Sequence, residues 1–182
     1  SRYRKEQKME SIYHDYWQQE LMYQFLVEDK CKKKAYVCSP YSAEDNEGML
    51  QNMRTARAYM FYAMKKMNMS ARAPHAYLPM LVCDKVPNER ALALEFGVNL
   101  LTRCDVLLVC GNRISNGMVQ EISNAAILGM PIIVFDDMLY LEVQKIVTKH
   151  NGDKKTVKLE SNHFPMSFTN PISYLEQAAM FK

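Results

Sequence analysis

The chain has 182 residues, 48% hydrophobic and 24% charged, which excludes an intrinsically disordered protein and is enough for one domain with a sizeable core plus appendages. Its net charge of +3 is too small to argue for nucleic acid, so we expect no nucleic-acid partner. No apolar run approaches the ~18 residues of a membrane span and no secretory signal is visible. We therefore expect a cytoplasmic protein without a membrane partner.

The cysteines predict a reduced core rather than a metal site. The five of them, Cys31, Cys38, Cys83, Cys104 and Cys110, form neither a CxxC pair nor a zinc spacing. Cys38, Cys104 and Cys110 lie in or beside apolar runs, as buried thiols of a cytoplasmic protein do. His, Asp and Glu show no ligand spacing either, so we expect no metal and no cofactor.

Apolar residues recur at helical spacing over residues 3–30, which predicts one long amphipathic helix ahead of the first strand. Its apolar stripe must be covered by the rest of the chain or by a second subunit, and the pattern leaves both open. An exposed stripe of this length disfavours a lone monomer, so we expect a homo-oligomer, a dimer or larger. The expected organisation is an N-terminal helix (1–34), an α/β domain (35–150) and a C-terminal extension with a short strand and a helix (151–182).

The first half of the α/β domain alternates between strand and helix patterns. In chain order we expect a strand over 35–39, a turn over 40–43 and a helix over 45–67 that Asp45 or Asn46 caps. A short strand with its exit follows over 69–77, and then an irregular stretch over 79–86. We expect Asn88 to cap a further helix that runs to about Arg103, with Pro87 ahead of it.

The stretch from Cys104 to Asp137 reads as a βαβ unit, around which we expect the domain to be organised. It comprises a strand over 106–109, a loop over 111–117, a helix over 118–128 stopped by Gly129 and Pro131, and a strand over 132–135. The loop follows the carboxyl end of a parallel strand, where open α/β sheets bind ligands. Downstream we expect a helix over 138–150 capped by Asp136 or Asp137, an edge strand over 156–159, a loop over 161–171 and a last helix over 172–181.

Candidate site residues gather in that loop and the first turn of its helix: Ser115, Asn116, Gly117, Met118 and Glu121. Ser115 can cap the helix, and its hydroxyl can also bind phosphate together with the amides of Gly117 and Met118. Glu121 has two open interpretations. A carboxylate near a helix N-terminus is favourable by ~0.3–1 kcal/mol without any function, or it is a nucleophile or general base at a ligand crevice.

Other candidates lie at the ends of the first two strands. Tyr36, Ser39 and Tyr41 flank the end of the first strand, and His75 follows the second. His75 is either a structural hydrogen-bonding residue or a ligand contact. Arg54 suits an anionic ligand if it faces inward and is otherwise an ordinary surface arginine.

The order of these segments resembles the nucleoside 2-deoxyribosyltransferase-like superfamily, most closely its small phage and bacterial members. The similarity covers roughly residues 35–136, in the segments AYVCSPYS, Asn52-Met53-Arg54, APHAYLP, PNER, FGVNLLTRCDVLLVCG and SNGMVQEISNAAILGMPI. It implies a Rossmann-like, doubly wound parallel sheet with flanking helices, and chemistry at the N-glycosidic bond of a nucleoside or nucleotide. The family's nucleophile, in its G-x-x-x-E segment, corresponds to Glu121, and the tyrosine beside that nucleophile corresponds to Tyr36.

Three positions depart from the pattern of the transferases. Those that use free nucleosides carry aspartate where this chain has Ser115, whereas the branch that acts on 2′-deoxynucleoside 5′-monophosphates carries serine beside the phosphate, so the resemblance favours a nucleotide. Relatives often read PYRG after the first strand, with an arginine where this chain has Ser42. Three explanations stay open: Arg54 replaces that arginine, the ligand differs, or the site has lost its reaction. Glu95 is the candidate for the acidic residue that positions the substrate.

Three functions remain open at this stage. The first is an N-glycosidase or deoxyribosyltransferase that uses Glu121. The second is a non-catalytic module, such as a phage accessory protein, that binds a nucleotide or a nucleotide-derived signal. The third is a structural oligomer with a vestigial crevice. A small-molecule nucleotide or nucleoside is the expected partner of the first two.

Overall fold

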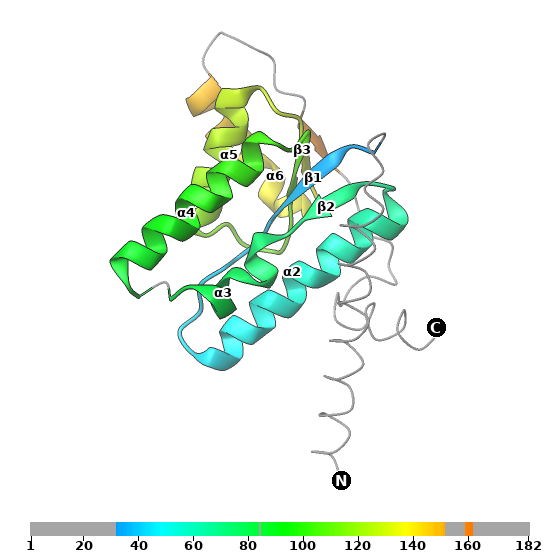
Figure 1. Cartoon of the computed structure of the whole chain (residues 1–182). Coiled ribbons are helices and arrows are strands. Elements are labelled where there is room, and N and C mark those ends of the chain that lie inside the picture. Colours follow the sequence, from blue (N-terminus) through cyan, green and yellow to red (C-terminus); the bar gives the residue numbers. More distant parts are fainter. Residues whose placement is uncertain (1–31, 84, 152–158, 162–182) are drawn as a thin grey trace.

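A computed structural model describes residues 32–83, 85–151 and 159–161 of the chain (Figure 1). Its strands are β1 (Lys34–Cys38), β2 (Ser70–Arg72), β3 (Val106–Val109), β4 (Ile132–Val134) and β5 (Leu159–Ser161). Its helices are α2 (Asn46–Lys66), the 3-10 turn η1 (Pro74–Ala76), α3 (Leu78–Leu81), α4 (Pro87–Thr102), α5 (Asn116–Leu128) and α6 (Asp137–Asn151). The described strands are all parallel, in the order β2-β1-β3-β4-β5. The predicted α/β fold with a Rossmann-like parallel sheet is confirmed.

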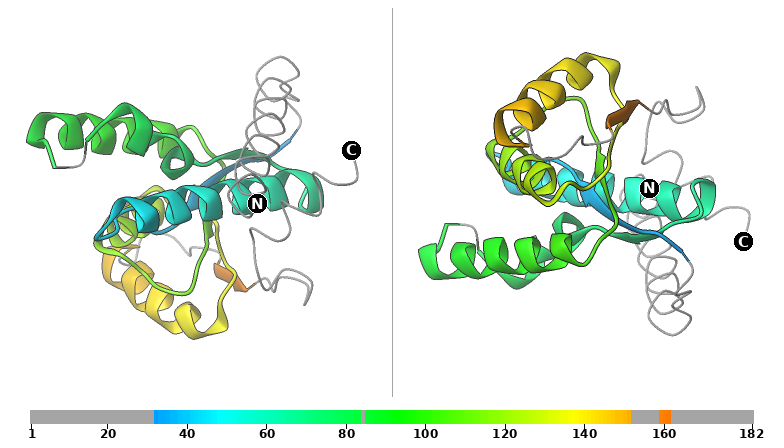
Figure 2. Two further views of the ribbon diagram at one scale, coloured as in Figure 1. Left: turned by 90° about the horizontal axis from the view of Figure 1, so that it is seen from below. Right: turned by 90° about the horizontal axis from the view of Figure 1, so that it is seen from above.

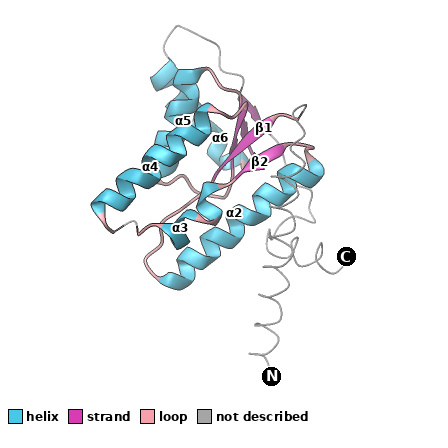
Figure 3. Ribbon diagram, viewed as in Figure 1, coloured by secondary structure: helices cyan, strands magenta, loops and turns pink. Residues whose placement is uncertain are grey.

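Both faces of the sheet are covered, because successive side chains of β1 belong to two different hydrophobic cores. Ala35 and Val37 belong to a core that includes α2, whereas Tyr36 and Cys38 belong to a second core that includes α5 and α6. Figure 3 shows the strands running between these helices. A strand buried on both faces is apolar along its whole length, as β3 with its sequence VLLV is.

Local signals set most helix ends. Asp45 caps α2, because its carboxylate accepts a 2.7 Å hydrogen bond from the amide of Gly48. The carboxylate of Asp136 accepts a 2.8 Å hydrogen bond from Met138 at the start of α6. α5 ends at Gly129, whose φ of +69° is the left-handed conformation that glycine adopts without strain.

Two local predictions were wrong. Asn88 does not cap α4: the helix begins one residue earlier, at Pro87, and Val86 is its cap residue without a side-chain hydrogen bond. Proline suits a first helical position because it has no N–H to leave unsatisfied there. The stretch 79–86 is also not wholly irregular, since it contains most of the one-turn helix α3.

Helix α4 stands apart from the other helices. Leu101 is its one buried residue, while Leu92, Leu94, Phe96 and Val98 are 42–59% exposed. Figure 2 shows its N-terminal end projecting beyond the rest of the described fold. Most of the apolar side chains of this helix are therefore open to solvent, and so is the wall that α4 contributes to the pocket described below.

Some of the remaining predictions can be compared with the structure, and others concern residues that it does not describe. Cys38, Cys104 and Cys110 are buried free thiols, as expected. A strand that pairs in parallel with β4 is present as expected, but it spans Leu159–Ser161 and so shares only Leu159 with the expected range of 156–159; residues 156–158 lie outside the described residues. The helices expected over 3–30 and 172–181 lie outside the described residues. Within the described part of the chain, no helix combines the length and apolar character needed to cross a membrane.

Candidate functional site

The site begins where β1 and β3 part at their carboxyl ends. The amide of Cys110 donates a 2.8 Å hydrogen bond to the carbonyl of Cys38, and beyond this link the two loops diverge. Gly111 has a φ of +92°, and a Cβ built there would lie 3.2 Å from Cδ of Pro40. Glycine is therefore needed for its conformation and for the close approach of the loops. Because α2 and α5 leave on opposite faces of the sheet, this is the point where doubly wound folds have a crevice.

Asn52 holds the loop that follows β1. Its side-chain amide donates to the carbonyl of Tyr41 over 3.1 Å and to that of Ser42 over 3.2 Å. These bonds tie the loop to α2 and fix one wall of the crevice. They also give the Asn52-Met53-Arg54 segment a physical role that the sequence pattern did not reveal.

The N-terminus of α5 forms the opposite wall. The hydroxyl of Ser115 accepts a 3.3 Å hydrogen bond from the amide of Met118, and its carbonyl accepts one from Val119. The amides of Asn116 and Gly117 come before these residues and have no acceptor within the helix. Together with the helix dipole, such amides favour an anion.

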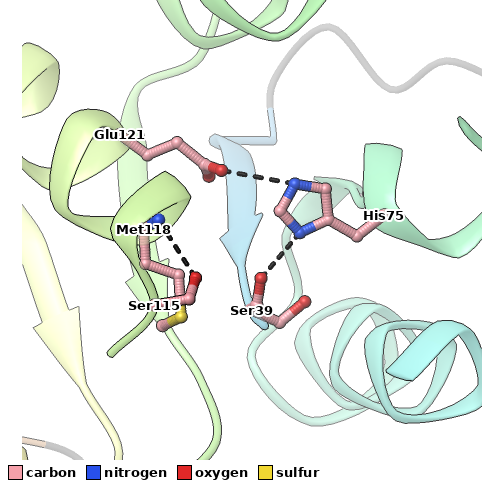
Figure 4. Close-up of polar contacts among 5 residues, drawn as sticks. All are labelled: Ser39, His75, Ser115, Met118 and Glu121. Carbon is pink, nitrogen blue, oxygen red and sulfur yellow. Dashed lines mark hydrogen bonds and ion pairs between the residues drawn. The ribbon is translucent and has the colours of Figure 1, made fainter. Parts of the chain in front are cut away.

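Glu121 lies one turn further into α5 and lines the pocket. Because the helix begins at Asn116, earlier than expected, Glu121 falls in its second turn, where the dipole effect has decayed. The interpretation of this residue as a simple dipole partner is weakened accordingly. Its Oε1 lies 3.3 Å from Nε2 of His75, and its Oε2 is buried and accepts no hydrogen bond from the residues that the structure describes (Figure 4).

His75 faces Glu121 from η1, on the other side of the crevice. Its Nδ1 donates to the carbonyl oxygen of Ser39 over 2.6 Å (Figure 4). Its ring centroid lies 4.9 Å from that of Tyr41. Burial by itself would lower the pKa of His75. The hydrogen bond and charge of Glu121, together with the Ser39 carbonyl, outweigh burial and raise the pKa above 6.5.

Tyr36 lines the crevice and Cys38 is fully buried two residues further along β1, and both side chains are neutral. Burial raises the pKa of both side chains well above their usual values, and the nearby Glu121 carboxylate raises them further. A second negative charge beside Glu121 is thus disfavoured. The carboxylate is the acidic group best placed here to carry a charge.

These elements enclose a pocket of about 500 Å³, within the range of small-molecule sites. Eight of the sequence-predicted residues line it: Tyr36, Tyr41, Ser42, His75, Ser115, Asn116, Gly117 and Glu121. Ser39 is buried and contacts His75, and Met118 is buried in the core beneath α5. Arg54 and Glu95 are not among the lining residues.

Several lining residues were not found from the sequence. Arg90 and Arg113 are the arginines of the pocket wall, in place of Arg54. Gln120 and Asn124 also line it. Asn124 lies three residues after Glu121 and Gln120 lies four residues after Asn116, and these spacings on one helix could have indicated it. Gly97 of α4 lies against the hydroxyl of Tyr36, at 3.4 Å from a Cβ built on the glycine. A glycine inside a helix pattern was the signal for such a close approach.

No cluster of three or more His, Cys, Asp or Glu suited to a metal ion occurs among the residues that the structure describes. The polar groups that converge on the pocket are one carboxylate, one imidazole, hydroxyls, amides and two arginines. That set can bind an anionic molecule at one place and present a carboxylate to it at another.

The fold and site define a Rossmann-like α/β domain with a pocket at the switch point of its sheet. A family model described as a domain of unknown function, DUF7768, matches residues 33–135, and the chain belongs to this family. Comparison with curated proteins and with solved structures finds no match. The family match covers β1 to β4, and with them the residues that line the pocket.

Proposed function

We propose that this protein cleaves the N-glycosidic bond of a (deoxy)nucleoside 5′-monophosphate, with Glu121 as the nucleophile and water or a second base as the acceptor. The observation that carries the proposal is the Glu121 carboxylate, 15% exposed and lining a pocket whose wall also contains the open N-terminus of α5. The resemblance of residues 35–136 to the deoxyribosyltransferase-like superfamily supports it. The expected homo-oligomeric state and cytoplasmic location belong to the same proposal.

The chemistry takes two displacements. A carboxylate oxygen of Glu121 bonds to C1′ of the sugar while the C1′–N bond breaks; its electron pair leaves with the base, which takes a proton from water. A water molecule then bonds to C1′, the bond to Glu121 breaks, and the water's proton passes to solvent. The carboxylate is regenerated, and the net change is hydrolysis of one C–N bond. Retaining glycosidases divide a difficult step in the same way.

The 5′-phosphate is assigned to the N-terminus of α5. The amides of Asn116 and Gly117, the hydroxyl of Ser115 and the helix dipole suit a phosphate. Arg113 and Arg90 on the pocket wall add positive charge on two further elements. They replace the arginine that relatives carry where this chain has Ser42.

The test of the reaction is release of free base from the four deoxynucleoside 5′-monophosphates and their ribose counterparts, followed by chromatography. We expect release by the wild type and loss of release in Glu121→Gln, which keeps the size of the side chain but removes its charge. Thermal unfolding of both proteins verifies that the variant is folded. Equal release by the variant and the wild type would contradict the role of Glu121.

The phosphate assignment has its own matched pair of variants. Asp and Asn both cap helices well and have nearly the same shape, but only Asp carries a charge. Ser115→Asp should therefore weaken binding of deoxyadenosine 5′-monophosphate strongly and of deoxyadenosine little, whereas Ser115→Asn should affect both ligands alike. If the two variants bind the monophosphate equally well, the phosphate does not lie at Ser115.

One observation favours a second candidate function, a module that binds a nucleotide without cleaving it. Oε1 of Glu121 contacts His75 and Oε2 is buried, so neither oxygen is widely exposed to a molecule in the pocket. Tight binding of a nucleotide that is recovered unchanged would establish this function instead. Neither binding nor release, in a stable oligomer, would leave the pocket without either role.

A further inference from the structure

The two nitrogen atoms of His75 are not equivalent. Nδ1 lies 2.6 Å from the carbonyl oxygen of Ser39. A carbonyl can only accept a hydrogen bond, so Nδ1 carries a hydrogen in every charge state of the ring. The nitrogen that gains and loses a proton is therefore Nε2, which faces Oε1 of Glu121 at 3.3 Å (Figure 4).

This geometry couples the charges of His75 and Glu121. With Nε2 bare and the carboxylate ionised, two lone pairs would face each other across 3.3 Å. The side chains are 11% and 15% exposed, so water does little to relieve that repulsion. One proton between Nε2 and Oε1 converts the repulsion into a charge-assisted hydrogen bond.

Among the groups around Glu121, His75 is the one suited to supply this proton. Tyr36 and Cys38, which face Glu121 from β1, are held neutral by burial and by the carboxylate itself. Arg113, from the loop before α5, and Arg90, from α4, line the pocket wall. His75, whose Nε2 lies 3.3 Å from Oε1 of Glu121, is a partner that can lose its charge near neutral pH.

We propose that His75 is a positioning residue for Glu121: the Ser39 carbonyl fixes its tautomer, and the proton thereby placed on Nε2 holds Oε1 and keeps the carboxylate oriented. The placement of the proton rests on the contacts alone. Its consequence for catalysis rests on the proposed function. Nothing in the resemblance on which that function draws assigns this role to His75.

The same geometry excludes His75 as the acid that protonates the leaving base. In a displacement at C1′ the base departs on the face opposite to the attacking oxygen. The proton on Nε2 is directed at the Glu121 carboxylate and is therefore on the side of the nucleophile. Its effect on the reaction therefore passes through Glu121.

The proton placement is tested by nuclear magnetic resonance of ¹⁵N-labelled imidazoles during a pH titration. Among the four histidines of the chain, the resonances of His75 are those absent from His75→Asn. We expect Nδ1 to stay protonated at all pH values, and the apparent pKa to fall by one unit or more in Glu121→Gln, a tenfold loss of proton affinity. An unchanged pKa in Glu121→Gln, or a neutral ring protonated on Nε2, would overturn the proposal.

The catalytic consequence is tested with two variants that each keep one contact. In His75→Gln the amide nitrogen lies near the position of Nε2 and can donate to Glu121 at any pH, whereas in His75→Asn it replaces Nδ1 and reaches only Ser39. We expect His75→Asn to lower kcat about 10-fold to 100-fold, with little change in KM. His75→Gln should keep more activity and lose the decline that the wild type shows as the pH rises above the pKa of His75.

The outcomes separate the two proposals. Resonance data that place the proton as described, in a protein that releases no base, refute the proposed function and leave the proton placement intact. Base release that depends on Glu121 but is equal in His75→Asn and the wild type refutes the positioning role and leaves the proposed function intact. Unfolding temperatures of both His75 variants distinguish a lost contact from a lost fold.

Discussion

Two glycine-to-alanine substitutions, Gly97→Ala and Gly111→Ala, should change stability in opposite directions. Gly97 lies inside α4, where glycine is about 0.8–1 kcal/mol less favourable than alanine. A Cβ there would lie 3.4 Å from the Tyr36 hydroxyl, which is an ordinary contact, so most of that gain is kept. Gly111 has a φ of +92°, where a side chain costs about 1–2 kcal/mol, and a Cβ would press on Pro40 at 3.2 Å.

The two variants should therefore differ by roughly 2–3 kcal/mol in free energy of unfolding. For a domain of this size Gly97→Ala should raise Tm by on the order of 3–6 °C, and Gly111→Ala should lower it by more. Circular dichroism during heating, with urea unfolding of the same samples, measures both. A lower Tm for Gly97→Ala would mean that the contact with Tyr36 is tighter than described, and a neutral Gly111→Ala would refute the strain at the crevice.

The Gly97 substitution also reports on the pocket. The added methyl group faces Tyr36 across the site, so binding of a deoxynucleoside 5′-monophosphate should weaken even as the protein becomes more stable. Gly97→Leu should weaken binding further, because its longer side chain extends into the space between α4 and α5. Isothermal titration measures the affinity. Unchanged binding in both variants would exclude the ligand from this part of the pocket.

Four smaller predictions concern the fold. Leu108→Ala should lower the free energy of unfolding by about 2–5 kcal/mol, because Leu108 is buried in the core on the α2 side of the sheet; urea unfolding measures the loss. Asp45→Ala should cost about 0.5–2 kcal/mol by removing the cap of α2, with Asp45→Asn close to the wild type. In the folded protein iodoacetamide should modify the exposed Cys83 and leave Cys38 unmodified, as mass spectrometry would reveal. The raised pKa of His75 means that its stabilising contribution is complete below pH 6.5 and is lost as the pH rises through the folded-state pKa, which urea midpoints at a series of pH values would follow.

Much of the fold was predictable because its signals are local. The continuous apolar run of β3 follows from burial on both faces, and the cap at Asp45 and the stop at Gly129 act within one helical turn. Where local signals competed, prediction failed. Both Asn88 and Pro87 mark helix starts, and the proline at the first helical position prevailed.

The site was predictable in part. Residues at the ends of parallel strands had to lie at one edge of the sheet, which is why Ser115, Glu121 and His75 could be assigned to one crevice. The arginines could not be assigned in this way. The sequence indicated Arg54 as a candidate, yet Arg90 and Arg113 line the pocket. The direction in which a helix face points depends on how the helix packs, which the sequence pattern does not give.

The sequence by itself determined the βαβ pattern, the caps of α2, α5 and α6 and part of the set of crevice residues, because each depends on neighbours a few positions apart. Only the tertiary structure decided that Nε2 of His75 meets Oε1 of Glu121 while Nδ1 meets the carbonyl of Ser39, three groups from three different elements. No local pattern contains that information, since it arises from the distance between α5, η1 and the end of β1 once the sheet has formed. The orientation of the carboxylate is a property of that packing.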